Sequence, residues 1–383
     1  MRRYYSTDYI LLIIVGILLL FGILILASVS AFFSQEKFGK PTYYFSHQLI
    51  YGLLPGIILG FFLFKIPLSF LKKWAWLFVL VNLFLAVLVF VPGLGVVAGG
   101  APRWLNLRFA IIQPSEFLKL TFILYLATLL AARTKKVQPK RNRGSEKFTF
   151  RFLKENERTT LIPFLIVIGI IVLLLTEQSD ISTLGVIIFT ALLMYFSSGT
   201  PLWHTILVVA IAGVSLAGLV KFVPYRMMRL KVLLGLIKDP MGIGYQIKQA
   251  LITIGSGGIF GVGLGMSNQK FGFIPQTMSD SIFAVFAEET GFVGSLILII
   301  LFLAFLWRGF RIAKMSQDKF SQLFAIGVSS WIVVQAFINI GAMIGLLPLT
   351  GIPLPLISYG GSHIVAELGG IGILLNISKR IKK

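Results

Sequence analysis

Residues 242–294 read GIGYQIKQALITIGSGGIFGVGLGMSNQKFGFIPQTMSDSIFAVFAEETGFVG, and the rest of the chain is organised around them. It is rich in glycine and carries lysines, amides and carboxylates, whereas long apolar runs lie on both sides of it. In a membrane protein, a polar and broken segment is tolerated where it faces water or lines a cavity walled by protein. A solvated loop with glycines at its turns is the alternative, and the rest of the chain decides between the two.

The composition predicts an all-α polytopic membrane protein. The chain has 383 residues, 57% of them hydrophobic and 13% charged, and a mean hydropathy of +0.90. A soluble protein of this size could not bury so much apolar surface. The formal net charge of +21 then acts as an orientation signal and a lipid contact, and we expect no nucleic-acid partner. The chain lacks cysteine, which excludes disulfides and thiolate metal sites.

Ten apolar runs are long enough to cross a bilayer as helices. We expect these spans near residues 9–29, 44–64, 74–91, 113–132, 160–176, 182–199, 204–222, 284–307, 321–345 and 362–377. They form a single membrane domain, 1–383, with a large outer loop at about 223–283 between the seventh and eighth helices and a basic cytoplasmic loop at about 133–158.

The distribution of positive charge predicts the orientation. With the N-terminus in the cytoplasm, most of the 35 lysines and arginines fall in inner segments, as the positive-inside rule requires. An even number of spans then places both termini in the cytoplasm. The long outer loop lies on the outer face of the cytoplasmic (inner) membrane.

Eight basic residues are expected on the outer side, against that rule: Arg103, Arg108, Arg226, Arg229, Lys231, Lys238, Lys248 and Lys270. An anionic ligand at the outer face is one physical reason for them, and snorkelling at the interface is the alternative. Eight acids also lie in the outer loop or near outer helix ends: Glu116, Glu177, Asp180, Asp239, Asp280, Glu288, Glu289 and Glu367. Because carboxylates near hydrocarbon are costly, their placement predicts one outward-facing cavity.

Two further local features are expected on the outer side, a short interfacial helix and a proline-containing loop. YRMMRLKVLLGLIKDP, residues 225–240, places basic residues beside Met and Leu, which is typical of a short interfacial helix. Further along the chain, Pro348, Pro353 and Pro355 predict a rigid re-entrant or surface loop before the last span, because proline cannot continue a helix.

Several separated segments follow one another in a recognisable order: GGAPRWLNLRFAIIQPSEFLKL (99–120), TEQSDISTLG (176–185), GYQIKQAL (244–251), GGIFGVGLGMSNQK (257–270), IPQTMSDSIFAVFAEETGFVG (274–294) and INIGAMIGLLPLTGIPLPLISYGGS (338–362). Over the whole chain, these motifs resemble the SEDS family (shape, elongation, division and sporulation), the FtsW/RodA/SpoVE-type peptidoglycan glycosyltransferases. The loop GAPRWLNL leans slightly toward the FtsW type.

The resemblance implies a polymerase that joins lipid II into glycan strands on the outer face of the membrane, for cell division or cell-shape maintenance. It implies a cognate class B penicillin-binding protein as a partner, together with other divisome or elongasome membrane proteins. The family's essential acid is matched by Asp280, but Gln276 stands where a glutamate is usual and Ser281 where a phenylalanine is usual. Asp180 is likewise retained, in a segment that has lost the usual proline and glycine.

Sugar transfer from a polyprenyl diphosphate needs a base for the acceptor hydroxyl and positive charge on the leaving diphosphate. Asp280, at the lip of an apolar span, is the expected general base, because partial desolvation raises its affinity for a proton. Its alternative role is to cap the following helix. For the diphosphate we expect Arg103, Lys119 and Lys270, with the amides of the glycine loop around 257–265.

The remaining substrate-binding candidates are Glu116, Glu177, Asp180, Gln269, Glu288 and Ser358. Glu116 and Lys119 are three residues apart on a helix and could simply pair, whereas Glu177 and Asp180 have no such partner. The adjacent acids Glu288 and Glu289 point to different faces, so only one of them should face the cavity. No cofactor follows from the sequence, and whether a divalent cation, Mg²⁺ or Mn²⁺, assists is left open.

Two other functions fit part of this pattern. A transporter that flips lipid II would also use broken helices and an outward cavity, but no inverted repeat is found in the sequence. A scaffold that only recruits the penicillin-binding protein would leave the placement of Asp280 beside a glycine loop unexplained.

Overall fold

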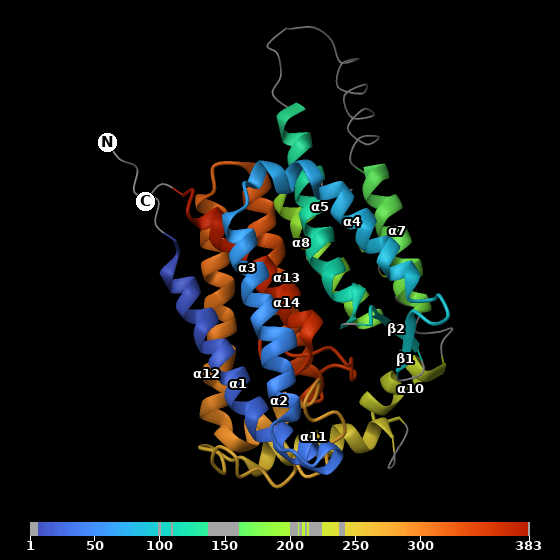
Figure 1. Ribbon diagram of the computed structural model, residues 1–383, viewed down its shortest axis with the longest axis vertical. Coiled ribbons are helices and arrows are strands. Elements are labelled where there is room, and N and C mark those ends of the chain that lie inside the picture. The colour runs from blue at the N-terminus through green and yellow to red at the C-terminus, as the bar shows by residue number, and fades with distance from the viewer. Residues whose placement is uncertain are drawn as a thin grey trace, which may run out of the picture.

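The computed structural model describes residues 7–98, 101–108, 110–136, 161–199, 224–236 and 242–381, together with the isolated positions 206, 209, 210 and 213. Figure 1 shows a bundle of long helices that run along the long axis of the molecule. The membrane-length helices are α1 (Tyr9–Phe38), the run of α2 (Tyr43–Gln48), η1 (Leu49–Leu53) and α3 (Leu54–Lys65), α4 (Leu68–Leu88), α5 (Pro114–Lys136), α12 (Ile282–Met315), α13 (Lys319–Met343) and α14 (Gly361–Ser378). Two shorter apolar helices are α7 (Ile162–Glu177) and α8 (Ile181–Ser197).

The predicted spans are confirmed wherever the structure describes them. Seven runs in the described part of the chain are long and apolar enough to cross a membrane, and α7 and α8 coincide with two further predictions. The span predicted at 204–222 lies almost entirely outside the described residues. The first helix continues to Phe38, further than predicted, and ends where Gly39 takes a left-handed conformation with φ 67°.

The core of the bundle is built around α13 and α14, the two most buried membrane-length helices. Helix α13 packs against α5, α8 and α12, and α14 packs against α3. The contact between α3 and α14 is close because a Cβ on Gly372 would overlap the backbone of Gly60. Small residues are what allow helix backbones to approach in a membrane bundle.

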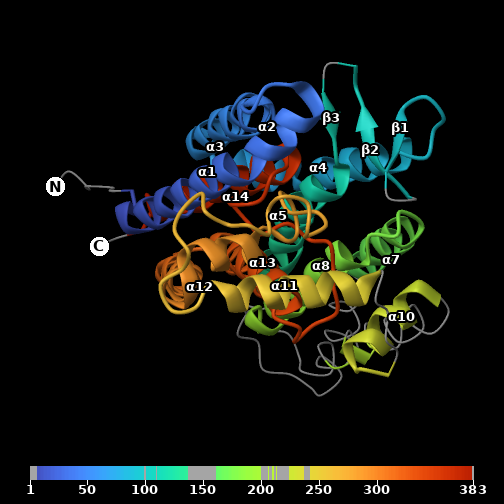
Figure 2. The same cartoon turned by 90° about the horizontal axis from the view of Figure 1, so that it is seen from below.

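The two ends of the described chain lie together at one end of the bundle (Figure 1). The backbone N–H of Asp8 donates to Ser378 Oγ at 3.1 Å, and the Asp8 carboxylate forms an ion pair with Arg308 at 2.7 Å. At the opposite end lie α10 (Pro224–Leu233), α11 (Ile243–Ser256) and the segment 257–281. Figure 2 shows α11 crossing the end of the bundle between α12 and α10.

A small sheet joins α4 to α5 and was not predicted. Its strands are β1 (Gly95–Ala98), β2 (Ala101–Asn106) and β3 (Ile111–Ile112), antiparallel in the order β1-β2-β3. Strands of two to six residues are too short to show a recognisable alternation in the sequence. The stretch predicted as an interfacial helix does form α10, whereas α11 was not predicted.

Helix α12 is broken at Gly291, where φ is 68° and ψ is −166°. Every residue from Ile282 to Glu289 is buried, so the first two turns lie inside the protein. The segment 258–263 replaces the hydrogen bonds that the break removes. The amides of Val262 and Gly263 donate to the carbonyls of Glu288 and Glu289 at 3.0 and 3.1 Å.

The same exchange runs in the other direction, because the amides of Phe292 and Val293 donate to the carbonyls of Gly258 and Ile259 at 2.9 and 3.1 Å. The glycine loop, residues 257–265, therefore supplies the backbone hydrogen bonds that are missing where α12 is broken. Its amides at Gly261, Val262 and Gly263 already have backbone acceptors, which leaves them poorly placed for the diphosphate we expected them to bind.

Gly291→Ala should destabilise the protein, since a Cβ there would overlap the backbone around Gly261 and the residue would keep a positive φ. We expect a loss of at least about 2 kcal/mol, measured as the thermal unfolding midpoint in detergent. Gly255→Ala is the matched control because nothing lies within 4 Å of its Cβ position, and its effect should stay within about 1 kcal/mol. Equal stability of the two variants would show that the close contact between Gly291 and the glycine loop does not stabilise the fold.

Candidate active site

Asp280 lies two residues before α12, at the end of the bundle opposite the termini. Its side chain is half-buried, and its Oδ1 accepts a hydrogen bond from Ser279 Oγ at 3.0 Å. The cap position of α12 is occupied by Ser281, which makes no side-chain capping bond. The alternative prediction, that Asp280 caps this helix, is therefore wrong.

Asn339 of α13 fixes the backbone at Asp280. Its Nδ2 donates to the carbonyl of Asp280 at 2.8 Å and to the carbonyl of Ile352 at 2.7 Å. Ile352 belongs to the proline-containing segment 344–360, which forms no helix between α13 and α14. Its residues 354–358 are buried, whereas Ile344, Leu346 and Leu347 are exposed. Of the two forms that the prolines predicted, a re-entrant or a surface loop, the first fits 354–358 and the second fits the start of the segment.

The loop 354–359 holds the two residues that precede Asp280. Ser358 Oγ donates to the carbonyl of Ser279 at 2.5 Å, and the amide of Tyr359 donates to the carbonyl of Met278 at 2.8 Å. Ser358 is fully buried and also accepts from the amide of Leu354 at 2.8 Å. These contacts support a positioning role for Ser358, and its role as a substrate ligand stays a prediction.

Burial raises the pKa of the Asp280 carboxyl, while the hydrogen bond from Ser279 and the positive charge of Arg229 act in the opposite direction. Arg229 lies on α10, and its Nη1 donates to the carbonyl of Leu349 at 2.5 Å. The structure thus brings a carboxylate with raised proton affinity and a guanidinium to one place. The charge pattern predicts Arg229 on the outer side, but no local sequence signal connects it with Asp280, because the two are fifty-one residues apart.

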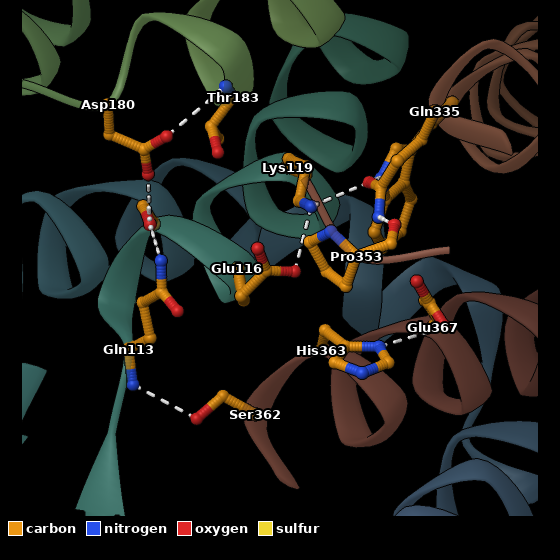
Figure 3. A network of polar contacts seen from close by, with 12 residues as sticks. Gln113, Glu116, Lys119, Asp180, Thr183, Gln335, Pro353, Ser362, His363 and Glu367 are labelled. Carbon is orange, nitrogen blue, oxygen red and sulfur yellow. Dashed lines mark hydrogen bonds and ion pairs between the residues drawn. The ribbon is translucent and has the colours of Figure 1, made fainter. Parts of the chain in front are cut away.

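A second group of polar side chains is buried between α5 and α13 (Figure 3). Lys119 Nζ lies 2.7 Å from Glu116 Oε2 and donates to Gln335 Oε1 at 2.7 Å. Gln335 Nε2 in turn donates to the carbonyl of Pro353 at 3.0 Å. The predicted pairing of Glu116 with Lys119 is confirmed, and the pair supports the same proline-containing segment that reaches Asp280.

Asp180 caps the start of α8 and is held by neutral hydrogen-bond donors, not by a cation such as the one that pairs with Glu116. It accepts from the amide of Thr183 at 3.3 Å and from Ser115 Oγ at 2.9 Å. Two residues further on, Ser182 Oγ donates to the carbonyl of Thr350 at 2.6 Å. Asp180 therefore acts as a helix cap beside the site, and Glu177 is exposed at the end of α7.

Arg103 extends from β2 to the turn between α7 and α8. Its Nε donates to the carbonyl of Gln178 at 3.0 Å, and its Nη2 donates to the carbonyl of Ser179 at 2.8 Å. Ser179 has φ 53°, which is uncommon for a residue with a side chain. The guanidinium stabilises this turn, so a contact with diphosphate would have to use its remaining N–H groups.

Lys270 belongs to a separate cluster against α1. Its Nζ lies 3.3 Å from Glu289 Oε1 and donates to Ser28 Oγ at 3.0 Å, and Ser28 Oγ donates to the same carboxylate at 2.6 Å. Glu288 accepts from Ser267 and, at 3.3 Å, from Ser256. The two glutamates have different partners, which agrees with the prediction that they point to different faces, but both are buried.

This cluster lies away from Asp280. Glu288 follows it by eight residues, which is about 12 Å at 1.5 Å per helical residue. Gln269 is half-buried beside Lys270. The acids that we expected in one cavity are therefore divided: Asp280 stands apart, Glu116 pairs with Lys119, and Glu288 and Glu289 lie near Lys270. Asp180 caps α8, Glu177 is exposed, Glu367 lies beside His363, and Asp239 is outside the described residues. In the described part of the chain, no group of three or more histidine, aspartate or glutamate side chains could hold a metal ion.

The fold and the site define a polytopic membrane protein with a carboxylate held at one end of its bundle. The model of the cell cycle protein family of FtsW, RodA and SpoVE matches residues 9–383, and the chain belongs to this family. Stage V sporulation protein E of Bacillus subtilis (strain 168) is 37% identical over 374 residues, which cover 98% of this chain and 97% of that protein. A protein named probable peptidoglycan glycosyltransferase FtsW, from Geobacter sp. (strain M18), is 33% identical over 382 residues, which cover 100% of this chain and 99% of that protein.

Solved structures agree with this assignment. A chain from a study entitled "Structural coordination of polymerization and crosslinking by a peptidoglycan synthase complex" has a TM-score of 0.73 at 26% identity, covering 97% of this chain and 98% of that chain. The rod shape determining protein RodA of Thermus thermophilus has a TM-score of 0.68 at 26% identity, covering 99% of this chain and 98% of that chain. The chain is therefore an integral membrane protein with a RodA-like helical fold.

Lys119→Met should destabilise the fold, because it leaves the Glu116 carboxylate buried beside no cation. Breaking a buried ion pair on one side typically costs about 3–5 kcal/mol. The double variant Glu116→Gln/Lys119→Met should recover much of that loss, measured by thermal unfolding in detergent. Arg311→Met, at an exposed position, is the control. If Lys119→Met unfolded like the control, the pair would have no structural role.

Proposed function

We propose that this protein is a peptidoglycan glycosyltransferase that polymerises lipid II, with Asp280 as its general base. The single observation that carries the proposal is the position of Asp280, half-buried at one end of the bundle and beside Arg229. Relatives named as peptidoglycan glycosyltransferases match nearly the whole chain, which supports the same activity.

In the proposed reaction, the Asp280 carboxylate accepts the proton of the acceptor sugar hydroxyl. The hydroxyl oxygen forms a bond to the anomeric carbon of the donor sugar, and the bond from that carbon to the diphosphate breaks. The polyprenyl diphosphate leaves with the electron pair of that bond. Partial desolvation keeps the carboxylate basic enough to take the proton, and Arg229 is placed to stabilise negative charge near the reacting centre.

Other residues shape this site or bind substrate further out. The contacts of Ser358, Asp180 and the Glu116–Lys119 pair support roles in holding the proline-containing segment and the helix ends. Direct contacts of lipid II with Arg103, Glu116, Lys119, Glu177, Asp180, Gln269, Lys270, Glu288 and Ser358 stay predictions. A divalent cation is also a prediction only, and no step of the proposed reaction passes through one.

The protein should lie in the cytoplasmic membrane as one domain, 1–383, with both termini in the cytoplasm and Asp280 at the outer face. A common side for both termini is supported by the contact between Asp8 and Ser378 and by Arg308, Arg311 and Lys314 at that same end of the bundle. A class B penicillin-binding protein is the proposed partner, supported by the likeness to a chain of a peptidoglycan synthase complex. Other division or elongation proteins are further proposed partners.

Asp280→Asn should fold but lose polymerisation, because the amide keeps the shape of the carboxyl group and cannot accept a proton as a base. Removal of a general base typically lowers the rate about 10²–10⁴-fold. The assay is glycan length made from labelled lipid II by purified protein with its cognate penicillin-binding protein. Burial raises the pKa of the Asp280 carboxyl, so this base becomes protonated at a higher pH than an ordinary aspartate. As the pH is lowered, wild-type activity should therefore be lost at a pH above the ordinary aspartate pKa of about 3.9.

Two outcomes would contradict the proposal in different ways. Polymer made equally by wild type and Asp280→Asn would keep the enzyme and discard the residue. Wild-type protein that moves lipid II across vesicles without making polymer would favour a flippase.

The orientation can be tested with two matched variants, because the chain has no cysteine of its own. Gln276 and Gln317 are both exposed and lie at opposite ends of the bundle. Gln276→Cys should react with an impermeant maleimide in intact cells, whereas Gln317→Cys should react only after permeabilisation. The reverse pattern would place Asp280 in the cytoplasm, where the proposed polymerisation could not occur.

A further inference from the structure

His363 and Glu367 form a buried pair on α14 that the proposed reaction does not use. They are one helical turn apart, with exposed fractions of 4% and 0%, and His363 Nδ1 lies 3.5 Å from Glu367 Oε2 (Figure 3). Ionisable residues within a membrane bundle are costly and usually serve a function. Their contacts show what that function is.

Both side chains bind the backbone of the loop 354–359. Glu367 Oε2 accepts a hydrogen bond from the amide of Leu356 at 2.9 Å, and His363 Nε2 lies 2.9 Å from the carbonyl oxygen of Ser358. Leu356 has φ 63°, a conformation that is unfavourable for a residue with a branched side chain. The carboxylate therefore stabilises the loop at the position where the backbone needs support.

The opposite side of the same loop binds the residues before Asp280. As described above, Ser358 Oγ holds the carbonyl of Ser279, and the amide of Tyr359 holds the carbonyl of Met278. A continuous path of hydrogen bonds thus runs from α14 through the loop to the backbone that carries Asp280.

The hydrogen-bond partners of His363 and Glu367 determine how many protons the pair carries. Nε2 of His363 faces a carbonyl oxygen, so this nitrogen carries a hydrogen. Its Nδ1 faces a carboxylate oxygen, which requires one further proton between Nδ1 and Glu367. The pair is then neutral as a whole, as apolar surroundings favour. Glu116 and Lys119 of α5 are the other charged groups that face His363.

We propose that His363 and Glu367 are positioning residues that hold Asp280, through the loop 354–359, in the place where it acts as a base. Neither side chain touches the reacting atoms. The inference rests on the proposed role of Asp280, and it assigns these two residues of α14 to the outer site.

The test is the pH dependence of lipid II polymerisation in His363→Leu and Glu367→Leu. A loosened loop would misplace Asp280, which should lower kcat about 10- to 100-fold with little change in KM. It would also hydrate the carboxyl group, so the acid limb of the kcat profile should move to lower pH by roughly one unit. Arg229, the charged group that faces Asp280, is unchanged in these variants. Glu367→Gln should stay closer to wild type than Glu367→Leu, because an amide oxygen in place of Oε2 can still accept from the amide of Leu356.

Asn376→Leu is the matched control. Asn376 is also buried on α14, but it binds the carbonyls of Leu63 and Ile66 at the far end of the helix. Its replacement should lower the amount of folded enzyme without moving the acid limb. Ser358→Ala offers a milder change along the same path, should His363→Leu fail to fold.

Hydrogen exchange of the peptide 278–281, followed by mass spectrometry, gives a readout that does not depend on turnover. Exchange should rise in His363→Leu and Ser358→Ala and stay at the wild-type rate in Asn376→Leu. An unmoved acid limb with unchanged exchange in the folded variants would overturn the inference and leave the role of Asp280 intact. If the wild type made no polymer, the proposed function would fail, and exchange would still decide whether α14 positions this segment.

Discussion

The fold depends on supplying hydrogen bonds to the N–H and C=O groups of non-helical backbone inside an apolar helix bundle. Residues 344–360 form no helix, and the part 354–358 is buried, where water cannot supply hydrogen bonds. Polar side chains of the neighbouring helices supply hydrogen bonds along the segment: Ser182 to Thr350, Asn339 to Ile352, Gln335 to Pro353 and Glu367 to Leu356. Because the same segment holds Met278 and Ser279, this requirement also fixes Asp280.

The sequence predicted what depends on hydrophobic periodicity and chain breakers. Long apolar runs located the helices, the prolines located the irregular segment before α14, and the spacing of Glu116 and Lys119 indicated their pairing. The position of Asp280 as the central acid came from the motif that it shares with the family. These features are local, so they can be read without knowing which helices are neighbours.

What the sequence could not predict are contacts between distant segments. The cations expected to face a ligand are Arg103, Lys119 and Lys270. Each has an internal acceptor on another element: the carbonyl of Gln178, the amide oxygen of Gln335 and the carboxylate of Glu289. The glycine loop has the composition of an anion-binding loop, yet it forms backbone hydrogen bonds with α12 where that helix is broken at Gly291. Arg229 approaches Asp280 only because α10 and α11 fold back across the end of the bundle.

Asp280 is a partly desolvated carboxyl group, and its burial raises its pKa. Infrared difference spectroscopy during a pH titration measures this directly, since protonated carboxyl groups have a distinct C=O band. We expect a band that titrates with a pKa above the ordinary aspartate value of about 3.9 and that is absent from Asp280→Asn. A band that titrates at or below that value, or one that persists in Asp280→Asn, would contradict this expectation.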